Sequence, residues 1–137
     1  MRRTGALFLL AATCLVALAS VARAAEAPKT GNIDVVELAG VLDRPLMAYA
    51  LDRLDQAERE GARLLVYQLD SIGGVKVSRN GELPELITRV RDAKIPVAVN
   101  IGPRRAHAGG AAAFLAAAAH VASIGPSGRF CCARLPF

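Results

Sequence analysis

The sequence predicts an α/β domain built on a parallel β-sheet, with helices between successive strands. Three observations predict this fold class. Short runs rich in β-branched residues alternate with helical patterns between residues 33 and 124. Some of these runs are almost continuously apolar, which is typical of strands buried on both faces. Glycine-containing turns separate the elements, and the βαβ alternation implies right-handed crossovers. The chain of 137 residues is long enough for one such domain.

The first strand and helix are expected within residues 33–61. Ile33–Ala39 is β-branched and half alternating, as in a strand near a sheet edge. Pro45 can open the next helix, because its missing N–H is not needed in the first turn. Gly61 is expected to end this helix. Its mostly apolar stripe consists of Leu46, Tyr49, Ala50, Arg53, Leu54 and Ala57.

The remaining elements continue the alternation. Hydrophobic periodicity and flanking glycine or proline residues set their expected bounds. In order, they are an interior strand at 63–69, a glycine turn at 70–74, a helix at 82–93, a strand at 95–101, a helix at 106–120 and a short strand at 121–124. The helix at 106–120 is so rich in alanine that we expect it to pack closely against its neighbours.

Both ends of the chain differ from this domain, which is expected at residues 25–128. Residues 1–24 form a predicted secretory signal, with a basic start, an apolar stretch and a small-x-small cleavage site. The mature chain is therefore expected to be exported across the cytoplasmic membrane to the periplasm or the outside. Residues 129–137 share neither the alanine richness nor the periodicity of the domain, and are interpreted as a frayed or out-of-frame tail.

Composition excludes several functions. The chain has 17 basic and 12 acidic residues, but the excess lies at its ends, so no nucleic-acid footprint is expected. The glycine turn has neither the P-loop nor the dinucleotide pattern, which disfavours nucleotide binding. Cys131 and Cys132 lack further ligands at metal-binding spacing. We therefore expect no cofactor and no metal.

Function is expected where the strands end. In an open parallel sheet, ligands bind beyond the carboxyl ends of the strands. In this sequence those ends correspond to the loops at 70–74 and 102–110. Arg104 and Arg105 fall in the second loop, where adjacent arginines are usually solvated.

The sequence resembles a known family in four segments. They are Val35-Val36-Glu37-Leu38 with Gly40-Val41-Leu42-Asp43, Gln68-Leu69-Asp70-Ser71-Ile72-Gly73-Gly74, Ile95-Pro96-Val97 and Ala118-Ala119-His120-Val121-Ala122. Together they resemble the ClpP/crotonase-like superfamily, and more narrowly the membrane-bound ClpP-class serine proteases called NfeD or nodulation-efficiency proteins. The resemblance covers about residues 31–128.

The resemblance implies a serine nucleophile at the head of the alanine-rich helix and a lysine base farther along. The two act together, because a hydroxyl is a weak nucleophile until a nearby amine removes its proton. In this chain the serine position is Gly110, and the chain leaves the family pattern near residue 128, before the lysine. The resemblance assigns the oxyanion-holding amides to Gly73 and Gly74. It also implies a polypeptide ligand, membrane association and a homo-oligomer.

Three functions remain open at this stage. The first is an exported, catalytically inactive protease-like domain. A second is an active membrane-associated serine endopeptidase, in which Ser71 or a further downstream segment supplies the catalytic dyad. The third is a peptide-binding or scaffolding module, in which a peptide adds to the sheet as a strand. His107, expected on the same helix face as Gly110, is a weak alternative base, although a surface histidine is the simpler interpretation.

Overall fold

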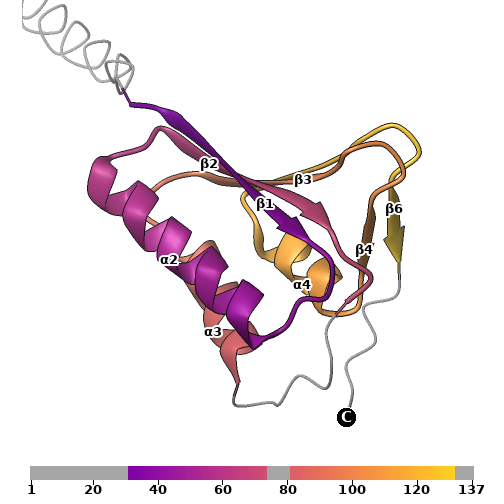
Figure 1. Ribbon diagram of the computed structural model, residues 1–137. Coiled ribbons are helices and arrows are strands. Elements are labelled where there is room, and N and C mark those ends of the chain that lie inside the picture. Colours follow the sequence, from indigo (N-terminus) through magenta and orange to yellow (C-terminus); the bar gives the residue numbers. More distant parts are fainter. Residues whose placement is uncertain (1–30, 74–80, 132–137) are drawn as a thin grey trace, which may run out of the picture.

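A computed structural model describes residues 31–73 and 81–131 of the chain (Figure 1). The elements in order are β1 (Ile33–Ala39), α2 (Arg44–Glu60), β2 (Leu64–Asp70), α3 (Glu82–Arg91), β3 (Val97–Ile101), β4 (His107–Gly109), α4 (Ala111–Ala118), β5 (Val121–Ile124) and β6 (Arg129–Cys131). The predicted signal segment lies outside the described residues. In the described parts of the chain, every helix is too short or too polar to span a membrane.

The main sheet has four parallel strands in the order β1-β2-β3-β5. The predicted α/β class and parallel sheet are therefore confirmed. Strands β4 and β6 form a separate two-stranded parallel sheet, which lies beyond the ends of β2 and β3 (Figure 1). The sequence analysis did not predict this second sheet.

Local signals explain the bounds of α2. The Asp43 carboxylate caps the helix by accepting a hydrogen bond from the Leu46 N–H at 3.0 Å, and Pro45 lies in the first turn. Gly61 ends the helix in the left-handed conformation, with φ of 68°. Tyr49, predicted on the apolar stripe, is exposed instead. The buried stripe is Met47, Ala50, Leu54 and Ala57.

The core lies between the main sheet and its helices. Helices α2, α3 and α4 lie on one face of the sheet (Figure 1). Alternate strand residues on that face are buried, among them Val36, Leu38, Leu65, Leu69, Val97 and Val99. On the opposite face Val35 and Val121 are 62% and 60% exposed. Because parallel sheets are usually covered on both faces, this open face is unusual.

Two sequence-based expectations are wrong in the same region. The helix predicted at 106–120 begins only at Ala111, because His107–Gly109 pairs as a strand and Gly109 and Gly110 are poor helix formers. The tail is not frayed at its start, since Arg129–Cys131 forms β6 beside β4. In both cases tertiary pairing overrides local composition. The rest of the tail lies outside the described residues.

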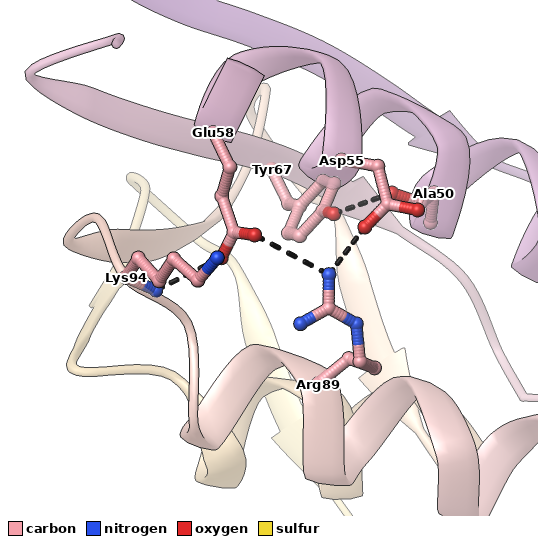
Figure 2. Close-up of polar contacts among 6 residues, drawn as sticks. All are labelled: Ala50, Asp55, Glu58, Tyr67, Arg89 and Lys94. Atoms are coloured by element: carbon pink, nitrogen blue, oxygen red, sulfur yellow. Dashed lines mark hydrogen bonds and ion pairs between the residues drawn. The ribbon is translucent and has the colours of Figure 1, made fainter.

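Tyr67 is the largest fully buried side chain of the core and carries a polar atom into it. Its hydroxyl donates a hydrogen bond of 2.6 Å to the Ala50 carbonyl oxygen of α2 (Figure 2). Nearby, Arg89 of α3 forms ion pairs with Asp55 and Glu58 of α2. Burial raises the pKa of Tyr67, and the carboxylate of Asp55 raises it further.

This buried hydroxyl predicts a loss of stability at high pH. The unfolded tyrosine ionises near pH 10, whereas the folded one stays protonated to higher pH. The unfolded state then binds fewer protons, so the contribution of Tyr67 is complete below about pH 10 and falls by about 1.4 kcal/mol per pH unit above it. Urea unfolding at pH 8 and at several pH values above 10 measures how the free energy of unfolding changes with pH. Tyr67→Phe should reduce this pH dependence, whereas Tyr49→Phe, at an exposed position, should not. Equal slopes in Tyr67→Phe and wild type would contradict the prediction.

Candidate functional site

Two chain segments meet at the carboxyl edge of the main sheet. They are the end of β2 with its following turn and the β4 strand with its following turn. The Ser71 N–H donates to the His107 carbonyl oxygen at 2.7 Å, and the Gly109 N–H donates to the Ser71 carbonyl oxygen at 3.0 Å. Ser71 and Ala108 form a parallel bridge. The two loops predicted to carry function are therefore adjacent, as expected for a parallel sheet.

Ser71 and Asp70 hold this junction together. Ser71 is only 1% exposed, and its Oγ accepts a hydrogen bond from the Gly73 N–H at 3.2 Å. The Asp70 carboxylate accepts a hydrogen bond from the backbone N–H of His107 at 2.9 Å. Gly73 has φ of 120°, a conformation that strongly favours glycine, and its carbonyl oxygen accepts from the Leu42 N–H. These contacts connect β2, β4 and the start of α2.

Gly110 occupies the sharp turn between β4 and α4. Its φ of 49° and ψ of −120° lie outside the regular regions for residues with side chains. A Cβ added there would lie 3.5 Å from the Gly73 Cα and 3.9 Å from the Ile72 carbonyl oxygen, so position 110 has room for a side chain. At Gly109 an added Cβ would lie 2.9 Å from the same oxygen, which is too close. A strand–turn–helix junction of this kind presents the nucleophile in many hydrolases.

A cavity of about 360 Å³ opens beside this turn. Its wall includes side chains from β6, which the sequence interpretation had assigned to a foreign tail. The lining residues are Ile72, His107, Ala108, Gly109, Gly110, Arg129 and Cys131. Cys131 is disulfide-bonded, and the other two cysteines of the chain lie outside the described residues. Sequence reasoning missed Arg129 and Cys131 because only their strand pairing brings them to the site.

The predicted site residues have different positions. Gly110 lines the cavity, and Gly73 lies beside Gly110 but is not a lining residue. His107 also lines the cavity, but from β4 rather than from the predicted helix. Ser71 is buried behind the turn and is not a lining residue. Gly74 lies outside the described residues.

The charged groups at the cavity are few. Its lining contains one arginine and one histidine and, among the described residues, no lysine and no carboxylate. Lys94 is the one lysine in residues 31–73 and 81–131; it precedes β3, at the opposite edge of the sheet, where its backbone N–H donates to Glu58 at 2.8 Å (Figure 2). No group of three or more His, Cys, Asp or Glu side chains in those ranges could hold a metal ion.

Sequence comparison finds one relevant relative. The membrane-bound protease PH1510 of Pyrococcus horikoshii is 27% identical over 85 aligned residues, which cover 59% of this chain and 18% of that protein. No protein-family model matches the chain. The sequence relationship therefore concerns a small part of a much longer protease.

Structure comparison finds the same protease. The 1510-N membrane-bound stomatin-specific protease, a lysine-to-alanine mutant in complex with a substrate peptide, has a TM-score of 0.65 at 22% identity, over 72% of this chain and 43% of that one. The 1510-N membrane protease specific for a stomatin homolog from Pyrococcus horikoshii has a TM-score of 0.64 at 22% identity, over 72% of this chain and 48% of that one.

A second class of enzyme shares the fold. An enoyl-CoA hydratase/isomerase family protein from Silicibacter pomeroyi has a TM-score of 0.62 at 20% identity, over 75% of this chain and 51% of that one. The chain thus spans about half the length, or less, of these relatives. The chain is a homologue of the membrane-bound protease PH1510, and its described residues have the α/β fold of the 1510-N protease and of the hydratase/isomerase protein.

Proposed function

We propose that this domain binds polypeptide at the cavity beside Gly110 and does not cleave it by serine–lysine chemistry. The observation that carries the proposal is the position of Gly110. It lies at a strand–turn–helix junction with room for a side chain, yet it has none to offer as a nucleophile. A protease fold with this substitution keeps its binding surface and loses its reactive group.

Among the described residues, no serine hydroxyl lines the cavity for a base to activate, although His107, the alternative base, does line it. A general base must lie within hydrogen-bond reach of the proton that it takes. Ser71 is buried, and its Oγ is already hydrogen-bonded to the Gly73 N–H, so a substrate carbonyl in the cavity does not reach it. Arg129 lines the cavity but stays protonated, so it does not act as a base. Lys94 is at the far edge of the sheet, and Lys29 and Lys76 lie outside the described residues.

The support for a polypeptide ligand comes from the 1510-N protease. The 1510-N protease, which shares this fold, has been solved with a substrate peptide. Binding an extended peptide through backbone hydrogen bonds does not require the nucleophile, so the loss of the serine leaves this part of the function possible. The active serine endopeptidase remains the alternative that the experiment below tests.

Export, membrane association and self-association complete the proposal. Export is supported by the signal-like residues 1–24, and membrane association by the membrane-bound character of PH1510. Self-association is supported by the open face of the main sheet, on which Val35 and Val121 are exposed. Gel filtration of the mature chain tests the last point, and a stable soluble monomer would contradict it.

A fluorophosphonate probe tests the loss of catalysis. We expect the chain to form no covalent adduct, as read by intact mass, under conditions that fully label an active serine protease added as a control. In parallel, a fluorescent peptide should bind and be recovered uncut. A stoichiometric adduct would overturn the inactive interpretation, and loss of that adduct in Ser71→Ala would then identify Ser71 as the nucleophile.

A further inference from the structure

The charged side chain among the described lining residues of the cavity is basic. Its charged or titratable lining side chains are Arg129 and His107, and no carboxylate of the described residues lines it. Asp70 is a neighbouring acid, but its carboxylate accepts the backbone N–H of His107 at 2.9 Å and is not part of the lining. Among the described residues, the cavity lining therefore offers hydrogen-bond donors and positive charge and no acidic partner.

Strand pairing places the two donors side by side. His107 and Arg129 are direct partners in the β4–β6 register, as are Gly109 and Cys131. Side chains at alternate positions of paired strands share a face, and Ala108, between His107 and Gly109, is only 1% exposed. The backbone N–H of Arg129 donates to the Ala106 carbonyl oxygen at 2.8 Å, which anchors the start of β6.

Arg129 lacks a counter-charge in the described part of the chain. Arg44, Arg89 and Arg91 each form an ion pair with a carboxylate, whereas Arg129, like the other described arginines, pairs with no described acidic side chain and differs from them in lining the cavity. Arginine in a cavity wall is well suited to a carboxylate, because its planar guanidinium donates two parallel hydrogen bonds. The position of Arg129 in the cavity wall, beside His107, therefore favours an anionic ligand.

Two further features fit a ligand that carries both a carboxylate and an apolar part. Gly110, the N-cap of α4, lines the cavity and supplies no side-chain cap, and the first turn of this helix contains no acidic residue. Ile72 lines the cavity and is 78% exposed, which offers an apolar contact. The volume of about 360 Å³ lies at the small end of ligand pockets, which range from about 300 to 1,000 Å³.

We propose that this cavity is a carboxylate subsite, in which Arg129 and His107 bind an acidic group of the peptide ligand while Ile72 contacts its apolar part. The inference rests on the proposed polypeptide binding and adds the class of peptide that is preferred. The carboxylate can be an acidic side chain or the C-terminal carboxylate of the peptide, since both present the same planar anion.

Matched fluorescent peptides test the proposal on the full chain by anisotropy. One apolar host peptide is made in four forms, with Glu or Gln at a central position and with a free or amidated C-terminus. We expect the preferred carboxylate to tighten binding about tenfold over its neutral counterpart, as for a charge-assisted hydrogen bond. Tighter binding of the Glu peptide than of the Gln peptide would identify an acidic side chain as the ligand group. Tighter binding of the free C-terminus than of the amidated one would identify the C-terminal carboxylate.

Variants assign the preference to the cavity. Arg129→Gln should abolish it without weakening the neutral peptide, and Arg129→Lys should keep part of it. Arg104→Gln is the matched control, because Arg104 is also exposed and is not among the lining residues. Neutral and acidic peptides that bind equally, or a preference that survives in Arg129→Gln, would overturn the subsite while leaving peptide binding intact. Failure of all four peptides to bind would overturn the proposed function and the subsite together.

Discussion

Gly109→Ala should lower the free energy of unfolding by about 2–4 kcal/mol, a large effect for the addition of one methyl group. The new Cβ would lie 2.9 Å from the Ile72 carbonyl oxygen and 3.3 Å from its carbon. These are backbone atoms in a turn held by hydrogen bonds from Ser71 and Gly73, so they do not move aside at low cost. The substitution therefore forces β4 away from the end of β2.

Gly110→Ala is the matched control, because it adds the same methyl group one residue later. Its Cβ would meet nothing closer than 3.5 Å, so the cost is that of the sparsely populated backbone conformation alone, about 1–3 kcal/mol. Urea unfolding followed by circular dichroism gives both values. If Gly110→Ala were the more destabilising, position 110 would lack the space that a nucleophile requires, and the assignment of this position would be wrong.

Ala112→Leu should lower the free energy of unfolding by about 1–3 kcal/mol, because it overpacks a closely fitted helix. Ala112 is fully buried in α4, and its neighbours Ala113 and Ala116 are each 1% exposed. Their small side chains let α4 approach α3 and β3 closely. Three additional heavy atoms at this position have no space unless the helix moves outwards.

Ala117→Leu provides the comparison within the same helix. Ala117 is exposed, so the same change should alter the free energy of unfolding by no more than about 0.5 kcal/mol. Thermal and urea unfolding of the two variants measure the difference. Equal losses at positions 112 and 117 would mean that the face of α4 that carries Ala112 is not packed against the domain.

Elements with strong local signals were predictable from the sequence. The main-sheet strands and the helix caps agree with the structure to within a few residues, because apolar periodicity, Pro45 and Gly61 act locally. The meeting of the two carboxyl-edge loops was also predictable, since parallel strands end at one edge. Close packing of the alanine-rich helix is likewise confirmed, although the helix is shorter than predicted.

Elements held by distant partners were not predictable. His107–Gly109 has a composition that favours helix continuation, and it becomes a strand because it pairs with Ser71 on one side and with β6 on the other. Arg129 and Cys131 reach the cavity only through that second pairing. Ser71, a candidate nucleophile in the sequence, proves to be a buried support of the Gly73 turn.

The amino-acid sequence by itself determined the α/β class, the succession of the main strands along the chain and the absence of a side chain at Gly110, because each depends on residue type and local periodicity. Tertiary structure alone decided that Gly110 faces the Gly73 turn, that Ser71 is buried and that Arg129 lies beside His107. Those relations join residues far apart in the chain, and hydrogen bonding between strand ends establishes them rather than any pattern within a short segment.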